Sequence, residues 1–382
     1  NWDREESLQV YSFNLPGLAA EPWRGLRLPF TGLSSRHMGP NTHSDIMAVF
    51  AWSMKQLAVG LLPTSRHDNE PWHVSDKLRA ELATNTSLVG KTKLPHNSVG
   101  CVAALCECRQ DWKHLKECFK FQGWLEVGGI CHLCNCTAEQ VREVGENASW
   151  RQPSGRLSHY DFLQRSFEQG LDISPIFSAP WVTTKIFKYD WLHAVDLGVA
   201  ADMLGQIFDF FIRTKGLAGT PGKTIAARCK DLWLDIQLWY KAQKVTDKLQ
   251  NLTPAMIRRS NQKWPKLRCS AAQARALVPY AAARAQQWLD ATILEHRAIQ
   301  TAAYHLNQCY LALSRDSIFW EGALAANSRK YALQIVALEA HELAREANEV
   351  ARWRVKPKLH AFLELCSDGS QPSLFWTYRD ED

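Results

Sequence analysis

The sequence predicts an α/β protein in which strand-like segments come first and one all-helical module follows. Short apolar runs bounded by Pro, Gly and polar residues recur up to about residue 190, a pattern typical of strands. From 194 to 354, apolar residues recur at helical spacing almost throughout. The chain has 382 residues, 46% of them hydrophobic and 22% charged, which is enough for two or three packed domains.

The first hundred residues mix both kinds of element. The apolar runs 8–15 and 26–30 are predicted strands. The run 46–62 has the length of a helix and a β-like first half, so its periodicity does not decide between the two. Residues 71–83 are predicted to form an amphipathic helix. Its apolar face would carry Val74, Leu78 and Leu82.

Residues 97–108 are predicted to form a buried strand, and residues 112–121 are predicted to form a helix. Asp111 lies between them. A carboxylate at the C-terminal end of a strand is a common metal ligand in α/β sheets. Asp111 is equally well placed to cap the following helix, and its position alone favours the cap.

Two short motifs contain residues that zinc prefers as ligands. Cys131-His-Leu-Cys134 places two thiols so that both can turn toward one ion, and Asp190-Trp-Leu-His193 offers a carboxylate and an imidazole three residues apart. Two sulfurs, one oxygen and one nitrogen suit a closed, structural zinc site. The alternative is that the cysteines are ordinary buried thiols and that Asp190 caps a helix.

The rest of the chain is predicted to be mainly helical. A short helix over 160–168 and an alternating strand over 181–188 precede Asp190. Pro357 marks the end of the helical module, because the residue before a proline is pushed out of the helical region. The predicted helices cover 194–213, 223–244, 271–313, with an interruption at Pro279, and 322–353; a new apolar segment begins at 359.

The net charge of +6 is unevenly distributed. Residues 213–268 contain 13 Lys or Arg and 3 Asp, a local balance of +10. Phosphate contacts supply most non-specific affinity for DNA, so this segment predicts a DNA-binding surface, with a solvated helical face as the alternative. The candidate residues are Arg213, Lys215, Lys223, Arg228, Lys230, Arg258, Arg259, Lys263, Lys266 and Arg268.

Eleven cysteines, several of them clustered between 101 and 136, favour a reducing compartment and a metal site over a disulfide framework. We therefore expect a nuclear or other intracellular location. No apolar run approaches the length of a membrane span, so no membrane partner is expected. The chain begins at Asn1 and ends in acidic residues, and we interpret it as a fragment of a longer protein.

The order of these parts resembles the catalytic region of CACTA-type (En/Spm-like) DNA transposases. A strand-end acid is followed by CxxC, then by DxxH, a long helical segment, and Lys-Pro-Lys-Leu-His. The resemblance implies an RNase-H-like mixed sheet with a zinc knuckle and a large all-α insertion. It also implies that three acids hold two Mg²⁺ or Mn²⁺ ions for DNA strand cleavage and transfer.

Under this resemblance Asp111 matches the second catalytic acid, and Cys131, Cys134, Asp190 and His193 match the zinc knuckle. The third acid would be Glu364 or Glu381. The first acid has no match in its usual strand context near Leu26, and Asp45 is the nearest carboxylate. We therefore expect DNA binding with little or no cleavage; the alternative is a non-catalytic, zinc-stabilised helical scaffold for DNA binding or protein interaction.

The resemblance implies that the chain has four regions. Residues 1–130 would form the N-terminal part of the RNase-H-like core, 131–193 the zinc-knuckle connector, 194–354 the helical insertion, and 355–382 a truncated C-terminal part of the core.

Overall fold

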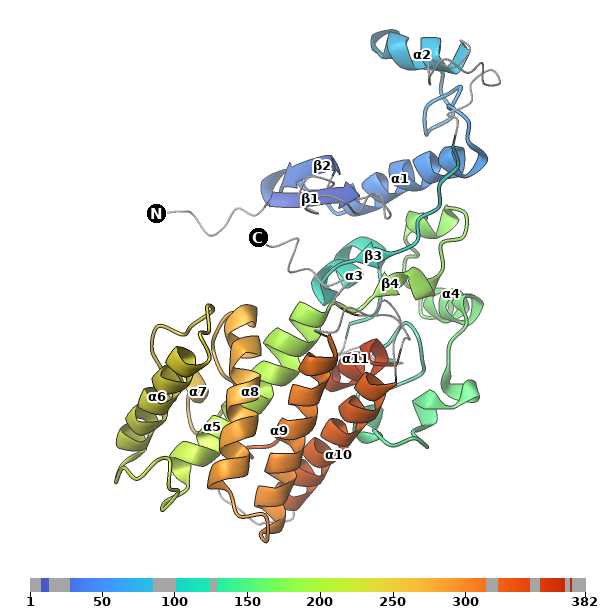
Figure 1. The fold of residues 1–382 in the computed structure, drawn as a ribbon. Helices are drawn as coiled ribbons and strands as arrows, with labels where there is room; N and C mark the ends of the chain where they lie inside the picture. The colour runs from blue at the N-terminus through green and yellow to red at the C-terminus, as the bar shows by residue number, and fades with distance from the viewer. Residues whose placement is uncertain are drawn as a thin grey trace.

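Helices dominate the computed structural model, and most of them lie side by side in its lower half (Figure 1). The structure describes residues 8–13, 28–84, 101–123, 129–313, 322–343, 351–367 and 372. The strands are few and short. The helix-rich α/β class is confirmed, whereas these residues contain two separate two-stranded sheets and not one mixed sheet.

The two predicted N-terminal strands pair with each other. β1 (Leu8–Phe13) and β2 (Leu28–Ser34) are antiparallel. The undecided apolar run is a helix, α1 (Thr42–Val59), which ends at Gly60 in the left-handed conformation. Phe30 of β2 stacks on Phe50 of α1, with 5.1 Å between ring centroids, so the strand pair and the helix share a small apolar contact.

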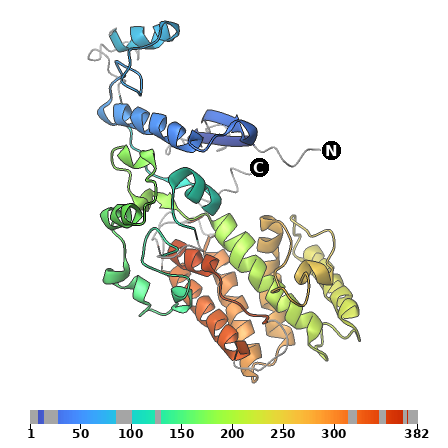
Figure 2. The same ribbon diagram turned by 180° about the vertical axis from the view of Figure 1, so that it is seen from behind.

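The predicted amphipathic helix forms only in its second half, as α2 (Lys77–Thr84). Its expected apolar face is not buried: Val74 is 90% exposed and Leu78 is 66% exposed. Figures 1 and 2 show why, because α2 stands at the far end of the molecule, away from the helical bundle. Apolar spacing predicted the helix but could not supply a surface for it to pack against.

The predicted strands at 97–108 and 181–188 are reduced to β3 (Cys108–Arg109) and β4 (Phe187–Lys188). The two are parallel, with Cys108 beside Phe187 and Arg109 beside Lys188. Residues 101–107 are extended without a ladder, and Val102 is exposed. The prediction of a buried strand is wrong for these residues, since an apolar run pairs only where a partner strand is present.

Three helices flank the short parallel ladder. α3 (Trp112–Phe119) begins directly after β3, as predicted. α4 (His159–Glu168) begins with a capping box, in which Ser158 accepts the backbone N–H of Asp161 and Asp161 accepts that of Ser158. After β4 the chain enters a π-helix, Leu192–Ala200. A π-helix of this length is unusual, and such segments are frequent at functional sites.

The helical module continues from the π-helix. Its members are α5 (Ala201–Arg213), α6 (Ile225–Ala242), α7 (Pro254–Ile257), α8 (Ala271–Trp288), α9 (Leu294–Leu313) and α10 (Ala323–Leu343). α5 is buried on all sides except at Arg213, so it is the centre of the bundle. A Cβ at Gly205 would lie 2.4 Å from the backbone of Lys266, so glycine is required where this segment crosses α5.

One helix boundary differs from the prediction. Pro279 lies inside α8, and the chain breaks instead between Trp288 and Leu294. Proline removes one backbone hydrogen bond, and the packing of a buried helix face such as that formed by Leu277, Val278 and Ala281 can outweigh this loss.

The last described helix is α11 (Pro357–Leu365), in which Pro357 occupies the first turn. Every residue from Leu359 to Leu365 is buried, because α11 lies between the π-helix, α10 and the connector (Figure 2). Within the described residues, no helix combines the length and the apolar character needed to span a membrane. All eleven cysteines are free thiols.

Candidate metal centre

The CxxC motif forms a closed, buried loop. The backbone N–H of Ile130 donates to the carbonyl of Cys136 at 2.9 Å, which brings the two ends of the loop together. The Sγ atom of Cys131 accepts the N–H of Leu133 at 3.3 Å, and that of Cys134 accepts the N–H of Cys136. Both sulfurs therefore point to one side of the loop, into the protein interior.

α11 brings an imidazole and a carboxylate to these sulfurs. His360 and Glu364 are four residues apart and thus share one helix face. His360 Nε2 lies 3.3 Å from Cys134 Sγ and 3.6 Å from Glu364 Oε1. One donor atom from each of Cys131, Cys134, His360 and Glu364 lies within 4.8 Å of all the others, and all four residues are buried.

These distances fit a single zinc ion. With Zn–S bonds of about 2.3 Å and Zn–N or Zn–O bonds of about 2.0 Å, donors at the corners of a tetrahedron are separated by about 3.3–3.8 Å. Two measured separations, 3.3 and 3.6 Å, lie in that range. Four protein donors leave no position for a substrate, so the donor set is that of a structural site.

The surrounding residues complete the centre. Arg156 donates to both oxygens of Glu364, at 2.5 and 3.1 Å, and Tyr189 donates its hydroxyl to Cys131 Sγ at 3.3 Å. The rings of Trp150 and His360 pack nearly perpendicular to each other, with 4.4 Å between their centroids. Two thiolates and one carboxylate around Zn²⁺ carry one net negative charge, which Arg156 neutralises; such outer contacts orient ligands and tune their basicity.

The ionisation of the thiols also favours a cation. Burial raises the pKa of Cys131, but its hydrogen bond with Cys134 and the charge of His360 outweigh this and hold the pKa well below its usual value. Burial and the Cys131 thiolate together raise the pKa of Cys134. Burial lowers the pKa of His360, but the Cys131 thiolate raises it to about 10. A metal ion would replace the protons that these groups otherwise share.

The predicted ligand set is therefore corrected in its second half. Cys131 and Cys134 are in the cluster, but Asp190 and His193 are not among its donors. Asp190 Oδ2 instead accepts the backbone N–H of His193 at 2.8 Å and contacts its Nδ1 at 2.6 Å. A histidine followed four residues later by an acid on an apolar helix, as in His360-x-x-x-Glu364, was the signal available in the sequence.

The ends of β3 and β4 form a second polar arrangement. Both strands run into the sequence Asp-Trp-x-His, at Asp111–His114 and at Asp190–His193. In each case one aspartate oxygen accepts the backbone N–H of the histidine and contacts its Nδ1. Because Arg109 lies beside Lys188 in the parallel ladder, the register leads Asp111 and Asp190 to the same edge.

Asp111 is thus the N-cap that its position predicted. Burial raises its pKa, but the hydrogen bonds from His114 outweigh burial and lower the pKa to about 2. The charge of His193 contributes to this shift, so the two caps lie within electrostatic reach of each other. Lys358 of α11 donates to the carbonyl of His193 at 2.7 Å, and its side chain passes over Gly198, where a Cβ would lie 2.6 Å from its Cδ.

The other predicted acids are placed differently. Glu364 belongs to the metal centre and pairs with Arg156, so it is occupied there. Asp45 lies in the first turn of α1 and is exposed. Glu381 lies outside the described residues.

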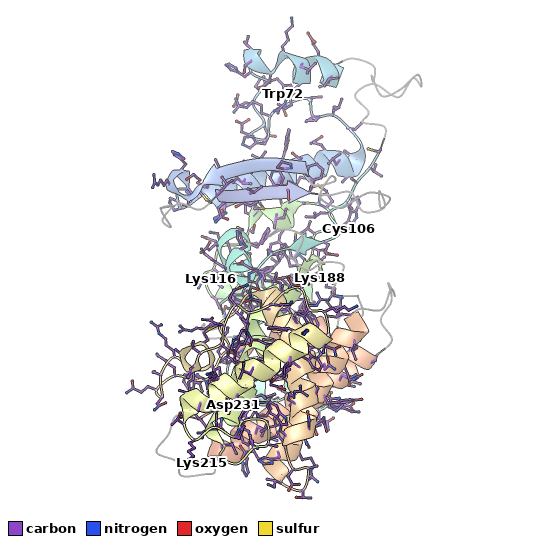
Figure 3. The ribbon with its side chains drawn as sticks, turned by 60° about the vertical axis from the view of Figure 1, so that its left-hand side comes forward. Trp72, Cys106, Lys116, Lys188, Lys215 and Asp231 are labelled. Carbon is purple, nitrogen blue, oxygen red and sulfur yellow. The ribbon has the colours of Figure 1, made fainter. Side chains whose placement is uncertain are left out.

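The ten predicted DNA-binding residues divide into two groups. Arg213 and Arg258 both contact the buried carboxylate of Asp209, and Arg228 donates to three backbone carbonyls, so these arginines are structural. The other seven are exposed: Lys215, Lys223, Lys230, Arg259, Lys263, Lys266 and Arg268. Figure 3 places Lys215 at the end of the bundle opposite Lys188.

No family model, curated protein or solved structure matches this chain. The fold and the site themselves define a helix-rich α/β protein with a buried donor set for one metal ion. That set joins the connector between α3 and α4 to the last described helix.

Proposed function

We propose that this chain is a transposase-like DNA-binding protein that holds two strand-end carboxylates, Asp111 and Asp190, next to a cationic helical module. The register of β3 and β4 carries this proposal, because it leads both aspartates to one edge of the ladder. Carboxylates at neighbouring strand ends are suited to Mg²⁺ or Mn²⁺, which proteins bind through one or two such groups together with phosphate oxygens.

The seven exposed cations of the segment 213–268 support the DNA-binding part. Exposed Lys and Arg side chains contact phosphates and release counterions, which gives sequence-independent affinity. The structural arginines hold the module together and are not counted among these contacts.

The arrangement of the acidic residues supports the expectation that the chain cleaves DNA slowly or not at all. In-line displacement at a phosphate depends on two correctly placed metal ions. Glu364, which was a candidate for the third acid, is paired with Arg156 in the metal centre. Asp111 and Asp190 each commit one oxygen to a helix cap, which leaves fewer oxygens for two ions.

The first test is the salt dependence of binding to duplex DNA. If six cations contact phosphates, a plot of log affinity against log salt concentration has a slope of about −5. An Arg259→Gln, Lys263→Gln double variant should reduce the slope by about 2, from about 0.9 per contact. Lys77→Gln in α2, also exposed but outside the segment, is the matched control and should change nothing.

The second test adds Mg²⁺ or Mn²⁺ and measures nicks in supercoiled DNA. We expect slow nicking or none. Rapid nicking that disappears in both Asp111→Ala and Asp190→Ala would contradict the expectation of inactivity and assign both residues to catalysis. Rapid nicking that survives both substitutions would remove the strand-end pair from the proposal.

A second candidate is a zinc-stabilised helical scaffold with no nucleic-acid role. It is favoured by the internal contacts of Arg213, Arg228 and Arg258, which account for three of the ten predicted DNA contacts. A salt slope near zero would select this candidate.

A further inference from the structure

A small pocket lies where the start of α5, the side of α10 and the segment before α11 meet. Its volume is about 20 Å³, and a water-sized oxygen needs roughly 10–15 Å³, so one oxygen atom fits inside. The pocket lies outside the metal centre and shares only Lys358 with the surroundings of the strand-end pair. Its polar lining consists of Asp202, Gln206, Tyr331, Arg354, Lys356 and Lys358.

Two neutral polar residues of this lining are buried. Gln206 is 2% exposed and Tyr331 is 3% exposed. Neither makes a hydrogen bond with any residue that the structure describes, although both line the pocket. Neither the amide of Gln206 nor the hydroxyl of Tyr331 is cut off from solvent, so both can bond a polar atom that enters the pocket. Burial and the charge of Asp202 raise the pKa of Tyr331, so its hydroxyl remains a donor.

The charged groups determine the sign of that atom. Arg354 and Lys356 contribute two positive charges and Asp202 contributes one negative charge. Lys358 adds a third positive charge below its pKa, which burial lowers to about 8, and its ammonium already donates to the carbonyl of His193. The cations are held in place before any ligand arrives. Lys356 donates to Asp202 at 2.7 Å, and the Arg354 guanidinium lies 3.6 Å from the centre of the Trp264 ring.

We propose that this pocket binds one oxygen of a phosphate group, with the rest of the group remaining at the surface near Arg354 and Lys356. The tyrosine hydroxyl and the glutamine amide donate to that oxygen, and the cations balance its charge. Charge-assisted hydrogen bonds of this kind are stronger than neutral ones. The phosphate is free inorganic phosphate or a phosphate of a nucleic acid, and the proposal does not depend on Asp111 or Asp190.

Calorimetric titration of the full chain with inorganic phosphate, at constant ionic strength maintained with sodium chloride, tests this inference. We expect saturable binding that Arg354→Met and Lys356→Met each weaken about tenfold. Gln206→Leu should weaken it without changing the charge. Lys77→Met, in an exposed lysine of α2 that lies outside the basic segment, should bind as the unsubstituted chain does.

Two oligonucleotide arms distinguish the sources of phosphate. A short single strand with a 5′-phosphate and the same strand without it are titrated into the chain and into Lys356→Met. Equal weakening of both strands by the substitution assigns the pocket to backbone phosphates; weakening of the phosphorylated strand alone assigns it to terminal phosphate.

No saturable phosphate binding, or binding that both Arg354→Met and Lys356→Met leave unchanged, would overturn the proposal. Phosphate binding together with a duplex-DNA salt slope near zero would retain the pocket and reject the proposed DNA-binding function. The two proposals therefore fail separately.

Discussion

Asp209 provides a quantitative test of the view that part of the basic segment is structural. Its carboxylate is fully buried in α5 and contacts three arginines. Arg213 Nε lies 2.7 Å from Oδ1, while Arg258 Nη1 and Arg352 Nε each lie 3.2 Å from Oδ2. We expect Asp209→Asn, which keeps the shape and removes the charge, to destabilise the chain strongly.

The expected size of the effect follows from the burial of each partner. The side chain of Arg258 is only 5% exposed, so loss of the buried Asp209 charge beside it costs about 3–5 kcal/mol. Arg213 and Arg352 are about one-fifth exposed, and solvent screens their contribution to about 1 kcal/mol or less each. Because asparagine still accepts one hydrogen bond, we expect a total loss of about 3–4 kcal/mol.

Urea unfolding at pH 7 with zinc present, followed by far-ultraviolet circular dichroism, measures this loss. Asp172→Asn is the matched control, since Asp172 is exposed and a surface change of this kind stays within about 0.5 kcal/mol. A loss below about 1 kcal/mol in Asp209→Asn would refute the argument, because it would mean that the three arginines are solvated in the folded protein.

Three further outcomes follow from the packing. Cys134→Ser should lose a zinc ion that the purified protein holds at about one per chain, whereas Asp190→Asn should keep it; metal analysis of both variants separates the two ligand sets. Gly205→Ala should lower stability by about 1–3 kcal/mol, because its methyl group meets backbone that cannot move aside, and thermal unfolding would detect this. Tyr310→Phe should cost about 1–3 kcal/mol by removing a donor from the buried carboxylate of Asp196, and the same substitution at an exposed tyrosine should be neutral in a denaturant titration.

Local signals in the sequence predicted local structure well. Asp111 is the cap of the helix that follows it, and the helices expected at 160–168 and 223–244 are present as α4 and α6. Helix caps and helical spacing depend on residues within one or two turns, so they can be predicted from the sequence without knowledge of the fold.

Contacts between residues far apart in the sequence could not be predicted in the same way. The CxxC motif indicated a metal site, but its other donors come from α11, more than 220 residues later in the chain. Asp190-x-x-His193 was the nearer candidate and has the right residue types, yet its own hydrogen bonds close it into a helix cap. Residue type and spacing predicted which atoms bind metal in general, whereas packing of the helical module decided which of them meet.

The sequence predicted longer strands than the structure contains, for a related reason. The apolar residues at 101–107 have strand-like composition, but a strand is stabilised by a ladder, and only Cys108 and Arg109 find one. The opposite happened at Pro279, where an interruption was predicted. The helix continues through the proline because α8 is buried on several faces.

The metal centre has a consequence for the order in which the chain assembles. Cys134 and His360 are separated by 226 positions, and α5 to α10 all lie between them. Closing a loop of that length in an unfolded chain costs about 5 kcal/mol of entropy. The donors can therefore meet at low cost only after the intervening helices have condensed. Zinc uptake should consequently be a late event in refolding, slower than the recovery of helical signal, and an ion added early would find Cys131 and Cys134 without His360 and Glu364.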